Sequence, residues 1–203
     1  MSSTLAPAKE TGIVATVKAS ALTLGGSVAV LWAAYLAQIV TFGLVTQMAI
    51  VPRTTAGLAG IAFAPFLHGS FGHLMANTIG FLMLAPLTML RNRKDFWAVT
   101  FLGGIASGLG CWLLGAPGTL HLGASGVIFA YLGFLMARGA FERRAGPIAL
   151  SILVTLFFGS MVWGIFPIIA GAGISWQAHM FGFFGGVGAA KVLGTELRKR
   201  NGG

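Results

Sequence analysis

The sequence has 203 residues, of which 56% are hydrophobic and only 8% are charged, with a formal net charge of +9. A soluble domain usually carries roughly a quarter charged residues, so this composition excludes an ordinary soluble protein. It predicts an all-α membrane protein, because apolar segments of about 20 residues cross a bilayer as helices. The single cysteine, Cys111, excludes an internal disulfide and a multi-cysteine metal site.

Apolar runs between charged residues and helix breakers predict six membrane-spanning helices. Their ranges are 24–50, 71–90, 96–115, 125–140, 147–166 and 173–193. The first run follows Lys9, Glu10 and Lys18, an arrangement somewhat like that of a signal peptide. We expect a retained helix instead, because the run exceeds a signal core and shows no clear small-residue cleavage site at its end.

The basic residues fall on one side of these six predicted spans. Of the 13 Lys and Arg residues, only Arg53 lies on the opposite side. Membrane topology and attraction to anionic lipid explain such a distribution, so we expect no nucleic-acid partner. The positive-inside rule places both termini in the cytoplasm. With the six predicted spans, the chain is expected to consist of a cytoplasmic N-terminal segment (1–20), a six-helix membrane domain (21–195) and a basic cytoplasmic tail (196–203).

The opposite face is predicted to lack acidic side chains. Its three segments, near 51–70, 116–124 and 167–172, contain no Asp or Glu. The four acids of the chain lie in the predicted cytoplasmic segments, at Glu10, Asp95, Glu142 and Glu196. A Ser-His-Asp triad on the outer side is therefore excluded, and a hydrolase there would depend on a dyad.

Three polar residues, Asn77, Ser125 and His179, are expected at one depth in the membrane. Each precedes a basic residue of the cytoplasmic side by 12 to 14 positions. At a helical rise of about 1.5 Å per residue, all three lie roughly 18–21 Å from that side. In a hydrocarbon core of about 30 Å, this layer is roughly 10 Å below the outer boundary. A hydroxyl and an imidazole at matched depth indicate a nucleophile and its base.

Ser125 lies in the motif Gly123-Ala124-Ser125-Gly126, which has two interpretations. The serine could simply cap the start of a helix. Alternatively, the free backbone N–H groups at that start suit a developing oxyanion.

The short fourth span cannot reach the outer surface, so the segment before it must dip inward. Irregular backbone at that depth is tolerated only when it is buried in protein or lines a water-filled cavity.

Small residues accompany His179 at every fourth position, and a similar row follows Ser125. The two rows are Ala178, Gly182, Gly186, Ala190 and Gly126, Ala130, Gly133. Small residues let two helices approach closely. Simple helix packing, with His179 hydrogen-bonded across it, is one interpretation. The other is that the two rows bring Ser125 and His179 into contact.

His73 and Asn77 are four residues apart and share one face of the second predicted helix. A metal site is the alternative, but no acid or cysteine lies nearby to complete it, so we expect no metal. Donors to an oxyanion fit these side chains better. His68 is expected to brace the junction between loop and helix, and His121 to lie in a loop exposed to water.

Together these residues resemble the rhomboid intramembrane serine proteases, over nearly all of residues 24–193. The resemblance rests on three motifs in the correct order: His68-x4-His73-x3-Asn77, Gly123-x-Ser125-Gly126 and Ala178-His179-x2-Gly182-x3-Gly186. It implies a six-helix bundle with a water-filled active site open to the outer face. It also implies transmembrane protein substrates, taken from the lipid bilayer, and no cofactor. We expect a bacterial plasma membrane, because the soluble extensions are minimal.

The resemblance also implies roles for individual residues. Ser125 would be the nucleophile and His179 the general base. His73, Asn77 and the backbone N–H of Ser125 would form the oxyanion hole. The other motif residues would support the site or pack the helices: His68, Gly123, Gly126 and Phe129 in the first group, Gly182 and Gly186 in the second.

Two departures from the family pattern leave alternatives open. Many members have a tyrosine where this chain has Phe129, and a Trp-Arg pair near where Ala59 and Gly60 stand. One alternative is a catalytically inactive rhomboid-like protein that binds membrane clients. Another is a small-solute channel or transporter that uses the same polar cavity, although intramembrane acids for proton coupling are missing.

Overall fold

The computed structural model describes residues 6–171 and 173–200, and this part of the chain is almost entirely helical. Its long helices are α1 (Ala6–Val40), α3 (Phe71–Thr88), α4 (Arg93–Leu114), α5 (Ser125–Glu142), α6 (Ala145–Phe158) and α8 (Trp176–Arg200). Shorter helices are α2 (Thr55–Phe63) and α7 (Pro167–Ala170), with the 3-10 helices η1 (Leu44–Met48), η2 (Ala64–Phe66) and η3 (Gly159–Ile165). The prediction of a helical protein is confirmed.

Four helical segments within the described residues are long and apolar enough to cross a membrane. They are Gly12–Val40, Phe71–Thr88, Arg93–Leu114 and Ala145–Ile165. Helices α5 and α8 are not among these four, and they carry polar residues such as Arg138 and His179. Composition and length therefore support four of the six predicted spans directly.

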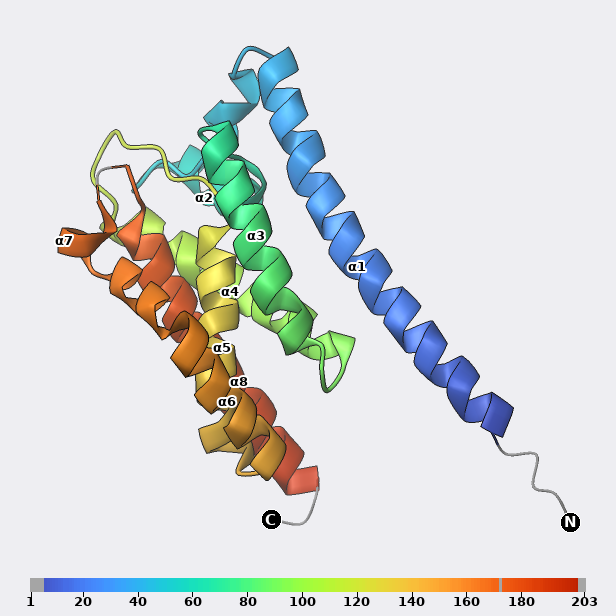
Figure 1. Ribbon diagram of the computed structural model, residues 1–203. Coiled ribbons are helices and arrows are strands. Elements are labelled where there is room, and N and C mark those ends of the chain that lie inside the picture. The colour runs from blue at the N-terminus through green and yellow to red at the C-terminus, as the bar shows by residue number, and fades with distance from the viewer. Residues whose placement is uncertain (1–5, 172, 201–203) are drawn as a thin grey trace, which may run out of the picture.

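Helix α5 forms the centre of the bundle (Figure 1). It packs against α3, α4, α6 and α8, and its side chains fill much of the core, including Tyr131, Phe134 and Leu135. Helix α1 lies at the outside and contacts α3. The start of α1 and the end of α8 lie at the same end of the molecule (Figure 1). The polar residues that α5 carries are thus held between neighbours on several sides.

The first predicted span, 24–50, differs from the helix that is present. Helix α1 ends at Val40, because Phe42 and Gly43 have φ angles of 50° and 84° and turn the chain out of the helix. The segment 51–70, expected to be a loop, contains helix α2. The hydroxyl of Thr54 caps this helix by accepting a hydrogen bond from the N–H of Gly57. The apolar segment that forms α2 is short, and in such a segment hydrophobic periodicity alone does not distinguish a helix from a loop.

The last two predicted spans also differ at their ends. Helix α6 ends at Phe158 and continues as the 3-10 helix η3, whereas α8 begins at Trp176 and extends to Arg200. Helix α8 thus includes residues 196–200 of the predicted basic tail. Residues 1–5 of the predicted N-terminal segment and 201–203 of the tail lie outside the described residues.

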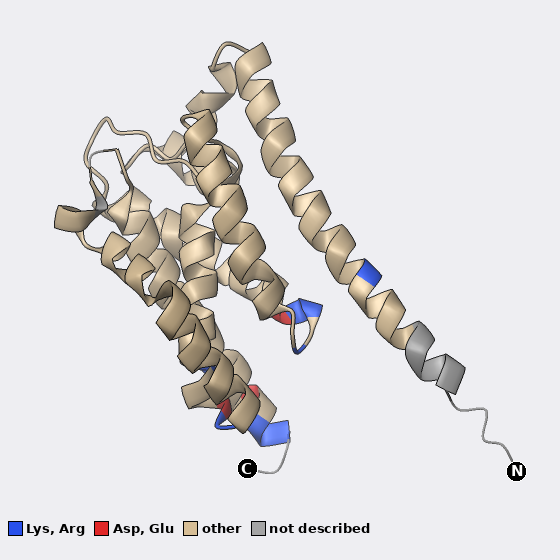
Figure 2. Cartoon of the chain, viewed as in Figure 1, with Lys and Arg blue, Asp and Glu red and all other residues tan. Residues whose placement is uncertain are grey.

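Charged residues gather at the end of the bundle where α8 ends and where α3 connects to α4 (Figure 2). At the other end, Arg53 donates hydrogen bonds to the carbonyl oxygens of Leu113 and Gly115, at 3.0 and 2.9 Å. These carbonyls belong to the C-terminal end of α4, where helical backbone acceptors lack partners within the helix. Arg53 therefore satisfies two backbone acceptors at the C-terminal end of α4.

Candidate active site

Ser125 and His179 come from different helices and lie in hydrogen-bond contact. The Oγ atom of Ser125 is 2.9 Å from Nε2 of His179. Helix α5 begins at Ser125, its N-cap residue is Ala124, and no side chain caps it. The interpretation of Ser125 as a helix cap is therefore wrong, because its hydroxyl is directed to the imidazole instead.

Close approach of α5 and α8 makes this contact possible. A Cβ atom at Gly182 would overlap the carbonyl oxygen of Gly126, and one at Gly186 would overlap that of Ala130. The backbones therefore touch directly along this seam, one residue after Ser125 and three after His179. Small residues are the usual means by which helices approach so closely in a membrane.

A backbone carbonyl fixes the tautomer of His179. Its Nδ1 atom lies 3.0 Å from the carbonyl oxygen of Gly164. Because a carbonyl only accepts, Nδ1 carries the hydrogen and donates it, and Nε2 keeps a lone pair that accepts from the Ser125 hydroxyl. The ring of Phe129 stacks on the imidazole, with centroids 4.0 Å apart and planes 6° from parallel. His179 is thus oriented by two groups, neither of them an acid.

His73 and Asn77 face the backbone that leads into Ser125. A Cβ atom at Gly123 would lie 2.6 Å from His73 Nε2 and 3.4 Å from Asn77 Nδ2, and the φ angle of Gly123 is 119°. A glycine is required at such a position. Asn77 is only 4% exposed, and its Nδ2 has no hydrogen-bond partner among the described residues. A buried donor without an acceptor is uncommon and suits an acceptor that appears during a reaction.

His68 is next to His73, and Gln38 of α1 binds its backbone. Its backbone N–H donates to Oε1 of Gln38 at 2.9 Å, and its carbonyl accepts from Nε2 of Gln38 at 3.0 Å. Its ring meets that of His73 edge-on, with centroids 5.2 Å apart. Within the residues that the structure describes, no three His, Cys, Asp or Glu side chains are grouped so that they could hold a metal ion. Sequence reasoning missed Gln38, although an amide inside an apolar span is a recognisable signal.

Stability is expected to fall in acid because of His68. The pKa of His68 is lowered from 6.5 to about 4, first by burial and then by the charge of the neighbouring His73, against the opposing effect of the Phe66 carbonyl. Since the unfolded chain takes up this proton first, the stabilisation is complete above about pH 6.5 and is lost as the pH falls toward 4. We expect Tm in detergent to decline across this window. The variant His68→Leu should show a shallower decline, and an unchanged slope would contradict the prediction.

His121 is buried, contrary to the expectation of an exposed loop residue, and only 7% of it is exposed. Its backbone pairs with Ile50, and its ring contacts Ser175 Oγ at 2.7 Å and Thr119 Oγ1 at 2.9 Å. It therefore joins the segment before α5 to the segment before α8. A cavity of about 20 Å³ beside His121, Ser175 and Gly123 is large enough for one water molecule.

Comparison with known proteins places these residues in a family context. Residues 57–196 match the Rhomboid domain. An uncharacterized protein of Mycobacterium tuberculosis strain H37Rv is 41% identical over 156 residues, which cover 74% of this chain and 65% of that protein. An uncharacterized protein of Mycobacterium leprae is 40% identical over 148 residues, covering 70% and 59%. The Bacillus subtilis protein named "Putative rhomboid protease YdcA" is 27% identical over 122 residues, 59% of each chain. The chain spans less than two thirds of the length of these relatives.

Proposed function

The chain belongs to the rhomboid family, and we propose that it is an intramembrane serine endopeptidase. It cleaves peptide bonds in or near the transmembrane segments of membrane-protein substrates, with Ser125 and His179 as its catalytic dyad. The observation that carries this proposal is the 2.9 Å contact between Ser125 Oγ and His179 Nε2. Because His179 Nδ1 donates its hydrogen to the carbonyl oxygen of Gly164, Nε2 is the atom that accepts the serine proton.

The dyad acts in two steps. Ser125 Oγ attacks the carbonyl carbon of the scissile bond while His179 Nε2 takes its proton, and the imidazolium then protonates the leaving amine. Water hydrolyses the resulting ester on Ser125, with His179 again as the base. The Gly164 carbonyl stabilises the imidazolium through Nδ1, a role that a carboxylate has in a triad. This chemistry requires no cofactor.

The negative oxygen of the tetrahedral intermediate is stabilised by donors around Gly123. These donors are His73 Nε2, Asn77 Nδ2 and the backbone N–H of Ser125, which the start of α5 leaves without a partner inside the helix. Preorganised donors of this kind act most strongly in a site that excludes bulk water. His68 supports His73 through its edge-on ring contact.

We infer that the chain crosses the membrane six times and that this site lies toward the outer side. The inferred spans are α1, α3, α4, α5, α6 with η3, and α8. An even number of spans agrees with α1 beginning and α8 ending at the same end of the molecule (Figure 1). The charged residues at that end (Figure 2) support a cytoplasmic location for it, because the positive-inside rule associates Lys and Arg with the cytoplasmic side. We infer a bacterial plasma membrane, because the relatives belong to bacteria. The polar side chains of α5 and α8 are tolerated because these helices face protein on several sides.

A direct test uses the purified protein reconstituted in liposomes with a reporter that contains one transmembrane segment. Cleavage at a single bond, mapped by mass spectrometry of both fragments, is the expected result. Sites near Gly, Pro or small polar residues should be preferred, because a substrate helix must unwind locally to expose its carbonyl. Binding of the reporter without cleavage would favour the client-binding alternative, and solute flux without cleavage would favour a channel.

Asn77→Ala is expected to reduce kcat by about 10²- to 10³-fold, the usual effect of removing one oxyanion donor. KM should change little, because the donor acts on charge that appears only in the transition state. Initial rates over a range of reporter concentrations separate the two constants, and Tm shows that the variant is folded. A loss of less than about threefold in kcat would remove Asn77 from the proposed oxyanion hole.

A further inference from the structure

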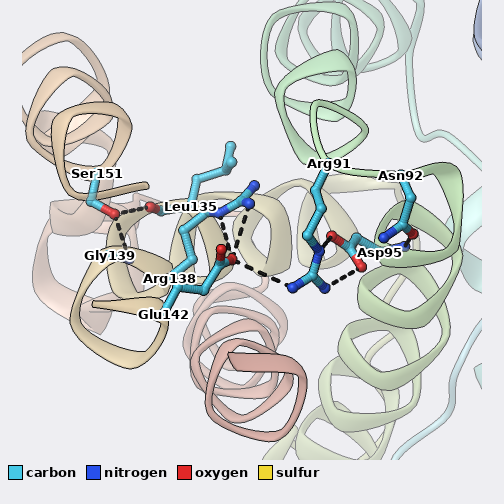
Figure 3. Close-up of polar contacts among 8 residues, drawn as sticks. All are labelled: Arg91, Asn92, Asp95, Leu135, Arg138, Gly139, Glu142 and Ser151. Atoms are coloured by element: carbon cyan, nitrogen blue, oxygen red, sulfur yellow. Dashed lines mark hydrogen bonds and ion pairs between the residues drawn. The ribbon is translucent and has the colours of Figure 1, made fainter. Parts of the chain in front are cut away.

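A buried network of charges lies thirteen residues along α5 from Ser125, at the charged end of the bundle (Figure 3). Arg138 donates from Nε to Oε1 of Glu142 at 3.0 Å, and its Nη2 is also 3.0 Å from that oxygen. Arg91 reaches the same carboxylate, with Nη1 3.8 Å from Oε1. Arg91 is also paired with Asp95, through Nε at 2.7 Å from Oδ2. The network joins α4 and α5 through the segment that follows α3.

Two guanidinium nitrogens of this network lack hydrogen-bond partners. The Nη1 atoms of Arg91 and Arg138 make no hydrogen bond within the described residues, although Arg138 is only 3% exposed, and Arg91 Nη1 has only the longer ion-pair contact to Glu142 at 3.8 Å. A buried charged donor without an acceptor carries a large desolvation cost. The two carboxylates of Asp95 and Glu142 therefore do not complete the hydrogen bonding of these arginines.

A cavity of about 380 Å³ lies against the same residues. Arg91, Arg138 and Glu142 line it together with Arg144, which is exposed at the start of α6. The volume is within the range of small-ligand sites, roughly 300–1,000 Å³. Counting the three arginines against Asp95 and Glu142 gives 3 − 2 = +1, so the surroundings of the cavity remain positive. An anion is the ligand that this charge and these donors favour.

Apolar side chains form another part of the cavity wall, namely Leu90, Pro147 and Leu150. Guanidinium groups match the geometry of phosphate oxygens, and Arg is well suited to their recognition. We propose that the cavity binds the phosphate group of an anionic phospholipid, from the leaflet that the charged end of the bundle faces. The arginines contact the phosphate, and the apolar wall contacts the adjoining part of the lipid. Basic pockets between membrane helices are suitable sites for such head groups.

Native mass spectrometry of the full chain in detergent tests this site independently of hydrolysis. The protein is titrated with phosphatidylglycerol or with phosphatidylcholine of the same acyl chains. We expect one phosphatidylglycerol to be retained, with an affinity about tenfold above that of phosphatidylcholine, which carries no net charge. Equal affinity for the two lipids would overturn the proposal.

Two neighbouring arginines provide a matched pair of variants. Arg143 and Arg144 are both exposed and carry the same charge, but only Arg144 lines the cavity. Neither substitution removes a partner of the buried network, so both variants should fold. Arg144→Gln is expected to weaken phosphatidylglycerol binding about tenfold, and Arg143→Gln less than twofold. Equal losses in both variants, or no loss in Arg144→Gln, would show diffuse surface attraction instead of a site.

Inorganic phosphate distinguishes the two possible sources of the ligand. It presents the same oxygens without acyl chains, so it should bind at least tenfold more weakly than phosphatidylglycerol. Displacement of phosphatidylglycerol by millimolar inorganic phosphate would agree with the lipid assignment, provided that Arg144→Gln also weakens the binding of inorganic phosphate. Binding of inorganic phosphate as tight as that of the lipid would overturn this assignment in favour of a soluble phosphate compound.

Discussion

Replacing Ser125 by alanine is expected to abolish peptide-bond hydrolysis while the helical bundle stays folded. The change removes the atom that attacks the substrate, and the loss in kcat should be about 10⁴-fold or more. Folding is preserved because the serine hydroxyl does not cap α5, and within the described residues its hydrogen-bond contact is with His179 alone. Cleavage of the transmembrane reporter and Tm in detergent measure the two properties.

His179→Ala should give a loss of similar size, and the double variant should be no worse than either single one, because the two residues act as a unit. Ser160→Ala is a matched control, since Ser160 is an exposed serine of η3 outside the dyad. It should retain full activity. Additive losses in the double variant, or cleavage by Ser125→Ala, would contradict a Ser-His dyad.

The second large effect is expected at Gly182, on the seam between α5 and α8. In Gly182→Ala, the new methyl group would overlap the carbonyl oxygen of Gly126, so the helices must move apart. Overpacking of this kind typically costs about 1–3 kcal/mol. The movement also separates Ser125 from His179, so we expect both a lower Tm and a loss of most activity.

Gly188 provides the control on the same helix, because a Cβ atom there would meet nothing within 4 Å. Gly188→Ala should be neutral or stabilising by up to about 1 kcal/mol, since alanine favours helix more than glycine does. Thermal unfolding of both variants in the same detergent gives the comparison. If Gly182→Ala were as stable and as active as Gly188→Ala, the backbone contact at Gly126 would not be what holds the dyad together.

Much of the family assignment was accessible from the sequence. The resemblance to rhomboid proteases, drawn from the motifs around His73, Ser125 and His179, is confirmed by the match of residues 57–196 to the Rhomboid domain. The expectation that Asn77, Ser125 and His179 share one depth in the membrane stays a prediction, and the Oγ atom of Ser125 lies 2.9 Å from Nε2 of His179. The expected depth of a residue in the membrane follows from helical rise alone, so it can be derived from a single sequence.

Other features depend on tertiary contacts that a single sequence does not reveal. The carbonyl of Gly164 orients His179, but a backbone atom in an irregular segment leaves no side-chain signal. The end of α1 at Val40 depends on the positive φ angles of Phe42 and Gly43, within a run that is apolar throughout. From the sequence, Arg138 and Glu142 indicate only the cytoplasmic side of the membrane. Their burial beside Arg91 depends on how three segments pack together, which the sequence does not show.

The most direct test of the proposed catalytic dyad is mapping of a fluorophosphonate probe by mass spectrometry on the detergent-purified protein. Such probes react with a serine whose hydroxyl is activated by a base, and not with an ordinary buried serine. We predict labelling at Ser125 in the wild type and its disappearance in His179→Ala. A folded wild-type protein that is not labelled at Ser125 would contradict the dyad and favour a rhomboid-like protein that binds membrane clients without cleaving them.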